Sequence, residues 1–196
     1  RLTGILNGCP ETPEGDRHRY DLDGLLRLFR SRVIRWSGSR ATTASAHFVA
    51  YTRALELGQR STDPAVILTG VGRVGEQKML ILRGAGSDGR SGLEAVLEGL
   101  GEAGIFVLLG EGDPEYERFL VAMSARFSNF LFLNGYSETC ASALYAAGDL
   151  FMMPSSFEPC GLSQMMALRN GQPCLVHGVG GLKDTIRNGQ NGFVFQ

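Results

Sequence analysis

The sequence has no excess of charge of either sign. Its 19 basic and 20 acidic residues give a formal net charge of −1 at pH 7. A near-neutral chain argues against a protein that binds nucleic acid backbones or anionic lipid. The sequence also lacks an apolar run near the roughly 20 residues that a membrane-spanning helix requires. We therefore expect no nucleic acid and no membrane among its partners.

Cysteine pairs with metal-ligand or redox spacing are also missing. The four cysteines, Cys9, Cys140, Cys160 and Cys174, form no Cys-x-x-Cys pair. Four cysteines so spaced do not indicate a disulfide framework, and they predict no metal site. Neither a Walker motif nor a Ser-His-Asp order is present, and we expect no cofactor. Without a basic and then apolar leader, the sequence favours a reducing, cytoplasmic location.

The composition is that of a folded domain. Hydrophobic residues make up 43% of the 196 residues, which is enough for one domain with a core. The chain begins with Arg1 rather than Met and ends at Gln196, directly after an apolar stretch. We expect a piece of a longer protein.

Two helical patterns are followed by an alternation of short apolar runs and helices. Helices are predicted over 21–36 and from about 45 to 57, which gives a helical start over 21–60. From residue 64 the apolar runs are continuous, as in strands buried on both faces. Alternating strands and helices predict an α/β fold with a doubly wound, Rossmann-like parallel sheet over 64–196. The expected strands are 66–70, 105–110, 130–133, 150–153 and 173–176, and the expected helices between them are 92–103, 114–127, 138–147 and 162–170.

The residues after the strands are the candidates for a binding site, because ligands of such sheets bind beyond the carboxyl ends of the strands. Glycines are frequent there, as a phosphate-bearing ligand requires. Arg73 and Lys78 follow the first strand and would suit a diphosphate, although ordinary surface charges are the reading that spacing alone favours.

Each of the other candidates has an ordinary structural alternative. Glu158 precedes a Pro-x-Gly helix start and would bind a sugar hydroxyl, or it complements the helix dipole. Tyr136 would stack on a base or fill the rim of the sheet. The pair Gly180-Gly181 would face a phosphate or form a turn. Cys160 fits a small buried residue, and His177 a structural one.

The order of these segments closely resembles the bacterial glycogen and starch synthase family, which are retaining glucosyltransferases of the GT-B fold. The string Phe-Glu-Pro-Cys-Gly-Leu at 157–162 is the most specific match. The matching segments are Gly4–Gly8, Gly72-Arg73-Val74 with Gln77-Lys78, Gly110-x-Gly112-Asp113, Gly135-Tyr136-Ser137-Glu138, Pro154–Gln164, Gly171, Gly180–Thr185 and Asn191-Gly192-Phe193.

The resemblance implies the C-terminal half of a GT-B enzyme, which binds ADP-glucose. Residues 1–20 would be a linker from a missing N-terminal domain, and residues 21–196 would be the nucleotide-sugar-binding domain, truncated at its C-terminus. This family transfers glucose to the non-reducing end of an α-1,4-glucan with retention. The acceptor would bind through the missing N-terminal domain, and the piece alone would be inactive. By this resemblance, Arg73 and Lys78 would neutralise the leaving diphosphate, and Tyr136 would stack on adenine. Glu158 would hold the glucosyl group together with the backbone amides of Cys160, Gly161 and Leu162. The phosphates would be lined by Gly180, Gly181 and Leu182.

The sequence departs from the family pattern at a few positions. Met79 stands where a glycine often follows the Gln-Lys pair, and residues 177–179 replace a basic residue and a Thr. Met166 stands where a related family has a second Glu, which favours the synthase branch.

Two alternatives to this assignment stay open. One alternative is another retaining GT-B transferase that uses a UDP- or GDP-sugar. The other is a non-catalytic nucleotide- or carbohydrate-binding module, against which the presence of Arg73, Lys78 and Glu158 counts.

Overall fold

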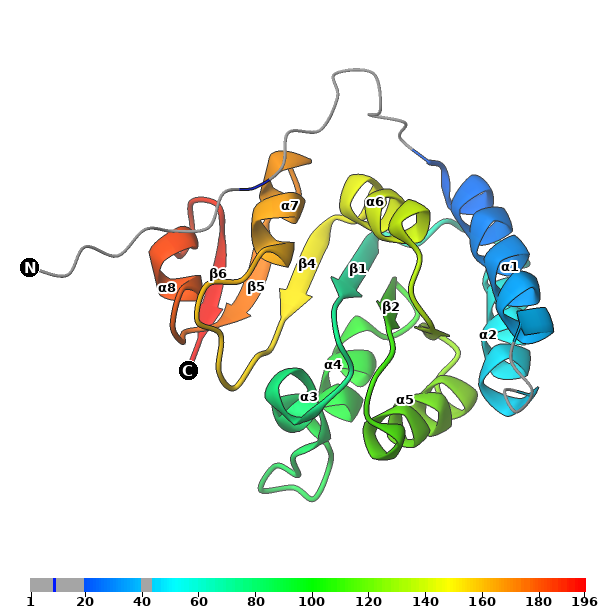
Figure 1. Cartoon of the computed structure of the whole chain (residues 1–196), viewed down its shortest axis with the longest axis horizontal. Helices are drawn as coiled ribbons and strands as arrows, with labels where there is room; N and C mark the ends of the chain where they lie inside the picture. The colour runs from blue at the N-terminus through cyan, green and yellow to red at the C-terminus, as the bar shows by residue number, and fades with distance from the viewer. Residues whose placement is uncertain (1–8, 10–19, 40–43) are drawn as a thin grey trace, which may run out of the picture.

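The chain folds around one six-stranded sheet in which all neighbouring strands are parallel (Figure 1). The computed structural model describes residue 9 and residues 20–39 and 44–196. The strand order β3-β2-β1-β4-β5-β6 is that of a Rossmann fold. The predicted fold class is therefore confirmed. The strands are β1 (Val66–Val71), β2 (Gly104–Gly110), β3 (Phe130–Asn134), β4 (Leu150–Met153), β5 (Cys174–His177) and β6 (Gly192–Phe195).

Helices cover both faces of the sheet (Figure 1). One core contains residues of α1, α2, α6, α7 and α8, and the other contains residues of α3, α4 and α5. The helices are α1 (Leu22–Ser39), α2 (Ala44–Leu57), α3 (Glu76–Arg83), α4 (Gly92–Leu100), α5 (Pro114–Arg126), α6 (Glu138–Ala147), α7 (Ser163–Arg169) and α8 (Leu182–Thr185).

The two cores explain why the strands read as continuous apolar runs. Successive side chains of a strand point to opposite faces of the sheet. In β2, Ile105, Val107 and Leu109 enter one core, while Phe106 and Leu108 enter the other. Every residue of β2 is buried. A polar residue on either face of this strand would lose its hydration. The strand therefore consists of apolar residues throughout and does not alternate between apolar and polar positions.

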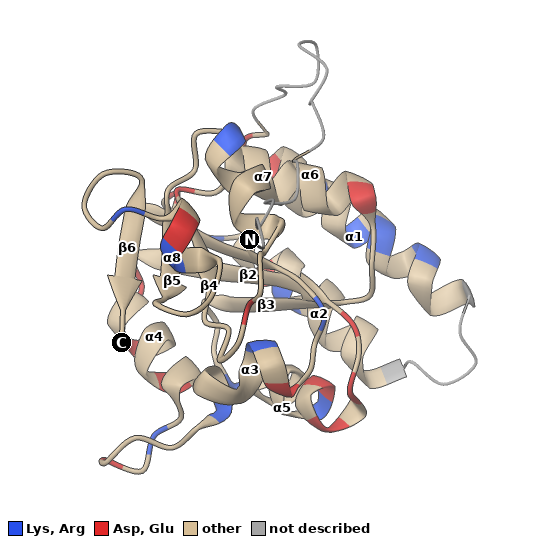
Figure 2. Ribbon diagram, turned by 60° about the vertical axis from the view of Figure 1, so that its left-hand side comes forward, with Lys and Arg blue, Asp and Glu red and all other residues tan. Residues whose placement is uncertain are grey.

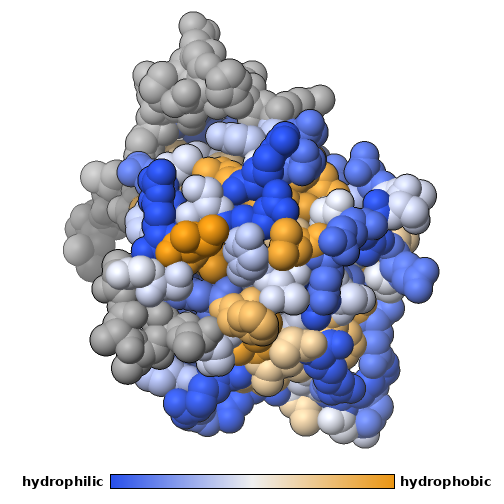
Figure 3. Space-filling view, turned by 90° about the vertical axis from the view of Figure 1, so that its right-hand side faces the viewer, coloured by the Kyte–Doolittle hydropathy of each residue, from blue (hydrophilic) through white to orange (hydrophobic). Residues whose placement is uncertain are grey.

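The hairpin of α1 and α2 packs beside β3 on one face of the sheet (Figure 1). Arg53 of α2 is buried and donates hydrogen bonds to the carbonyl oxygens of Ser124 and Ala125 at the end of α5. Such carbonyls have no partner within their own helix. Hydrophobic side chains, with Ile34 and Phe48 among the exposed ones, gather on the face that carries α1 and α2 (Figure 3).

Two elements were missed by the sequence analysis. It left residues 76–83 as a loop after the first strand, whereas they form α3. It also assigned no strand to 192–195, which forms β6 at the edge of the sheet. The predicted linker, residues 1–20, lies outside the described residues except for Cys9 and Tyr20. None of the described helices is both long and apolar enough to span a membrane. Acidic and basic residues are interspersed along the ribbon, and α5 carries both (Figure 2).

Candidate functional site

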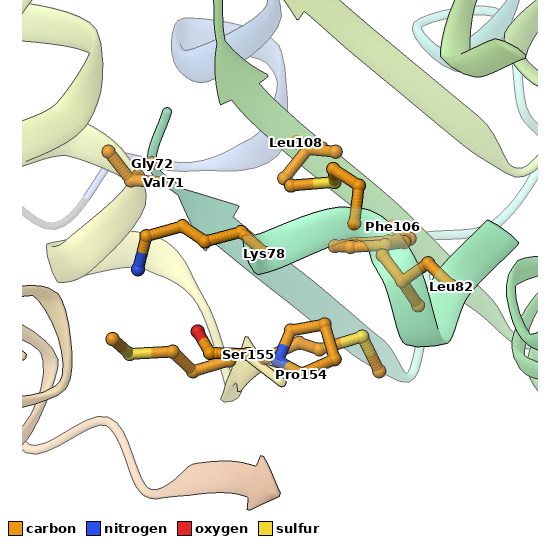
Figure 4. Close-up of a pocket in the computed structure, with 11 residues that line it drawn as sticks. Val71, Gly72, Lys78, Leu82, Phe106, Leu108, Pro154 and Ser155 are labelled. Atoms are coloured by element: carbon orange, nitrogen blue, oxygen red, sulfur yellow. The ribbon is translucent and has the colours of Figure 1, made fainter. Parts of the chain in front are cut away.

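A pocket lies where the order of the strands reverses, between the carboxyl ends of β1 and β4 (Figure 4). The chain leaves β1 toward β2 on one side and β4 toward β5 on the other, so a crevice opens between them. Lys78 reaches from α3 toward the segment Pro154–Ser155, and Leu82 and Phe106 lie at the apolar end (Figure 4). The residues that line the pocket are Val71, Gly72, Lys78, Met79, Leu82, Phe106, Leu108, Met152, Met153, Pro154 and Ser155.

The first turn of α3 brings Lys78 against Glu158. Lys78 Nζ lies 2.8 Å from Glu158 Oε2 in an ion pair that joins α3 to the loop after β4. Glu158 is only 7% exposed, and Ser155 Oγ also donates to its Oε2, at 3.3 Å. The stem of Lys78 lies over Gly72, where an added Cβ would come within 3.0 Å of Lys78 Cδ. A cation that lines the pocket is thus paired with a nearly buried carboxylate on the loop after β4.

Backbone and side-chain hydrogen bonds hold the loop that carries Glu158. Gln77 Nε2 donates to the carbonyl of Phe157 at 2.7 Å, and the backbone N–H of Ser156 donates to the carbonyl of Gln77 at 2.8 Å. His177 Nδ1 lies 2.9 Å from the carbonyl oxygen of Ser155. His177 therefore has the structural contact that the sequence analysis favoured. The bracing role of Gln77 was missed, although its position beside Lys78 in the matched segment was a usable signal.

The glycine pair Gly180-Gly181 lies directly on this loop. Gly180 has a φ of +45°, and an added Cβ would lie 1.9 Å from the carbonyl oxygen of Glu158. At Gly181 a Cβ would lie 2.6 Å from Cys160 Cα. The N–H of Gly181 donates to the Glu158 carbonyl at 2.9 Å, and that of Leu182 donates to Val179. The glycines are required by this close approach, and the N–H groups of Gly181 and Leu182 already have protein acceptors.

The segment after Glu158 is braced by a glutamine that the sequence analysis did not single out. Gln164 Nε2 donates to the carbonyl oxygens of Cys160, at 3.0 Å, and Gly161, at 2.9 Å. Gly161 has a φ of +76°, and a Cβ there would lie 2.3 Å from Gln164 Oε1. Within the described part of the chain, the N–H groups of Cys160, Gly161 and Leu162 donate to no protein acceptor. Those three N–H groups are free for a ligand.

Arg73 and Tyr136 follow β1 and β3 at the same edge of the sheet, but their side chains are in solvent. Tyr136 is 62% exposed, and Arg73 is also exposed. Among residues 9, 20–39 and 44–196, no ion pair involves Arg73. The same residues hold no group of three His, Cys, Asp or Glu side chains that would bind a metal ion. The structure thus joins Lys78 to Glu158 and leaves Arg73 and Tyr136 without ion-pair or ring partners.

Comparison with known proteins identifies the family of the chain. The model of the family "Glycosyl transferases group 1" matches residues 92–196, slightly more than half of the chain. The chain belongs to this family. A glycogen synthase of Pseudomonas fluorescens is 42% identical over 196 residues, which cover 99% of this chain and 33% of that protein. The chain spans about a third of the length of the curated relatives it matches.

Solved structures of glycosyltransferases share the fold of this group 1 chain. The catalytic domain of starch synthase IV from Arabidopsis thaliana, bound to ADP and acarbose, has a TM-score of 0.61 and 27% identity. The match covers 90% of this chain and 32% of that one. HepE from Anabaena, in complex with UDP-glucose, has a TM-score of 0.55 at 21% identity, over 79% of this chain and 40% of that one. The predicted GT-B fold is therefore confirmed, and so is the predicted likeness to glycogen and starch synthases.

Proposed function

We propose that the chain binds the nucleotide sugar ADP-glucose and forms the donor side of a synthase. That enzyme would transfer glucose, with retention, to the non-reducing end of an α-1,4-glucan. The observation that carries the proposal is the ion pair of Lys78 and Glu158 at the switch point of the sheet. A cation beside a carboxylate matches a ligand in which a diphosphate is joined directly to a sugar. The 42% identity to a glycogen synthase supports the choice of glucose and glucan.

The proposed chemistry rests on charge that develops on the leaving group. As the bond from the sugar to the diphosphate breaks, negative charge grows on the diphosphate oxygens. Lys78 would stabilise that charge from the floor of the crevice, and Arg73 from its rim, with little reorganisation. The carboxylate of Glu158 would accept hydrogen bonds from sugar hydroxyls. The N–H groups of Cys160, Gly161 and Leu162, which have no protein acceptor, would donate to the same ligand.

The glycine pair would contribute mainly through its shape. Gly180, Gly181 and Leu182 would run beside the phosphates, and the two glycines let this segment approach the backbone of Glu158 and Cys160, which stands where their Cβ atoms would lie. Of their N–H groups, those of Gly181 and Leu182 already donate within the protein. We therefore assign to Gly181 and Leu182 the support of the Glu158 loop, and to Gly180 a direct approach to phosphate.

The acceptor would bind to chain that lies outside these 196 residues. Polymer synthesis needs a cleft that positions both reactants and excludes water. The relatives are about three times as long as this chain. We therefore propose that the chain alone binds the donor and elongates no glucan. Incubation with ADP-glucose and glycogen, followed by assay of released ADP, tests this, and measurable elongation would overturn it.

Calorimetric titration tests the donor. We expect ADP-glucose and ADP to bind, and UDP and GDP to compete weakly. Equal or tighter binding of UDP would favour the alternative of a UDP-sugar transferase. Replacement of Lys78 by Met should abolish most of the ADP affinity. Replacement of Arg27 by Met, which removes an exposed cation on α1, should leave the ADP affinity unchanged and serves as the control. Failure of ADP-glucose, UDP-glucose and GDP-glucose all to bind would refute the proposal.

A further inference from the structure

The turn after β3 packs against a ring pair on α1 and α2. An added Cβ on Gly135 would lie 2.9 Å from the Cδ2 and Cε2 atoms of Trp36, so the indole covers this glycine directly. Trp36 is stacked with His47 at a centroid distance of 6.0 Å and an interplanar angle of 30°. His47 Nε2 lies 3.1 Å from the carbonyl oxygen of Asn134. Two rings thus contact the backbone of the two residues that precede Tyr136.

His47 is held in one orientation. It is 2% exposed, and its Nε2 donates to the Asn134 carbonyl, since a carbonyl oxygen only accepts. Its Nδ1 is buried and has no partner among the described residues. A buried polar atom without a partner is costly. Among the described residues, the hydrogen bond from Nε2 to the Asn134 carbonyl is therefore the polar contact that orients the His47 ring.

The side chain of Tyr136 is not fixed by packing of its own. It is 62% exposed, so its placement follows from the backbone of Asn134 and Gly135. A flat ring binds a base well only if it is presented at a set angle and height, because stacking falls off as the rings separate. Whatever holds that backbone therefore affects stacking on Tyr136.

We propose that Trp36 and His47 are positioning residues for the nucleobase of the donor. They hold the backbone of the turn Asn134–Tyr136 in place, so that the Tyr136 ring is preorganised to stack on the base. The inference rests on the proposed function, in which Tyr136 stacks on the base. It assigns a role in donor recognition to the hairpin of α1 and α2, which lies outside the residues that the family model matches.

The experiment separates binding of the base from binding of the phosphates. Affinities for ADP and for inorganic pyrophosphate are measured by calorimetry with the 196-residue chain. The variants are Trp36→Leu, Trp36→Phe, Tyr136→Ala and the double variant Trp36→Leu/Tyr136→Ala. Phe48→Leu is the matched control, because Phe48 is an exposed ring on the same hairpin. Thermal melts establish that each variant folds.

We expect Trp36→Leu to weaken ADP about threefold to tenfold and to leave pyrophosphate unchanged, as for partial loss of base stacking. Trp36→Phe retains a ring over Gly135 and should retain most of the affinity. In the Tyr136→Ala background, Trp36→Leu should add no further loss. His47→Leu should reproduce Trp36→Leu, whereas Phe48→Leu should match the parent.

Each other result overturns the inference in a recognisable way. If Trp36→Leu weakens ADP and pyrophosphate equally, the hairpin acts on the fold and not on the base. If Tyr136→Ala weakens ADP but Trp36→Leu does not, the inference is wrong while base stacking stands. If Tyr136→Ala leaves ADP unchanged, the stacking role fails and the inference fails with it, although Lys78 can still bind the diphosphate. If the parent binds no nucleotide, the proposed function itself is refuted.

Discussion

Neutralising Glu158 should tighten the binding of ADP. In the free protein the carboxylate lies 2.8 Å from Lys78 Nζ and is only 7% exposed, so it competes with any diphosphate for that ammonium group. In the proposed complex with a sugar nucleotide, hydroxyls of the sugar would bind the carboxylate and offset this competition. ADP has no such sugar and meets the carboxylate as a like charge. The change Glu158→Gln keeps the shape of the side chain and removes the charge.

The size of the effect follows from the geometry. A phosphate oxygen on the far side of Nζ would sit roughly 5–6 Å from the carboxylate, about twice the observed ion-pair distance. Two unit charges at that distance repel by about 3 kcal/mol at an effective dielectric constant of 20 and by about 0.7 kcal/mol in water. The Lys78 side chain is 20% exposed and that of Glu158 10%, so we take an intermediate value of about 1–2 kcal/mol. This corresponds to a gain of roughly fivefold to thirtyfold in ADP affinity.

Calorimetry at low and at high salt measures this gain. Screening should reduce it at high salt, because the crevice is open to solvent. The control is Glu98→Gln, which makes the same charge change on α4, a helix that leads into the start of β2 at the opposite edge of the sheet. The gain should be smaller when Lys78 is already replaced by Met. Unchanged or weaker ADP binding by Glu158→Gln would refute the reasoning, and an equal gain from Glu98→Gln would assign it to net charge.

Three further predictions concern stability. Replacing Arg53 by Met leaves the buried carbonyl of Ser124 without its donor, so the free energy of unfolding in urea should fall by about 2–3 kcal/mol. The control Arg27→Met removes an exposed i,i+4 ion pair and should lower it by less than about 0.5 kcal/mol. Ser91→Ala removes the capping box of α4 and should cost about 1 kcal/mol by the same assay; no change would show that the box is not stabilising. Burial raises the pKa of the Cys174 thiol to about 12 from its ordinary value near 9. Between pH 9 and 12 the folded chain keeps a proton that the unfolded chain loses. The free energy of unfolding should therefore fall by up to about 1.4 kcal/mol per pH unit in this range. The variant Cys174→Ala should lack this contribution to the pH dependence.

The sequence predicted the sheet well because burial on both faces leaves a strong pattern. The expected runs at 105–110 and 130–133 coincide with β2 and β3 to within a residue. The helix predicted over 138–147 is α6. In these segments continuous apolar runs, and a Ser137 whose side chain caps the helix, agree with the tertiary structure.

The missed elements are those whose local pattern is ambiguous. The helix α3 has eight residues and begins after Gly75, which provides no side-chain cap. Its stability comes from Met79 and Leu82, which are buried in the core beneath it. The strand β6 has four residues at the end of the chain and is set by its pairing with β5. Neither contact is visible from local sequence.

The candidate site, like the fold, has features that the sequence predicted and features that it did not. Position after a strand made Lys78 and Glu158 candidates, and the resemblance to the synthases supplied their expected roles. That the two form an ion pair depends on the adjacency of β1 and β4, whose paired residues, Leu68 with Leu150 and Thr69 with Phe151, are 82 positions apart in the sequence. The role of Gln164 was not predicted, although the carbonyls it binds lie only three and four residues before it. The role of Gln77 was not predicted because it binds the carbonyl of Phe157, 80 residues along the chain, which only the fold brings near. The contact of Trp36 with Gly135 is of the same kind.

The Lys78–Glu158 pair depends on three separate strand ends at once. Lys78 is placed by α3 after β1, Glu158 by the loop after β4, and that loop is held through Gly180 and Gly181 by the segment after β5. An alanine at 180 would put a Cβ 1.9 Å from the Glu158 carbonyl oxygen and would force the loop to move. Because the pair needs contact at hydrogen-bond distance, a shift of an ångström separates its charges. A ligand that binds both groups is therefore sensitive to substitutions at glycines it never touches.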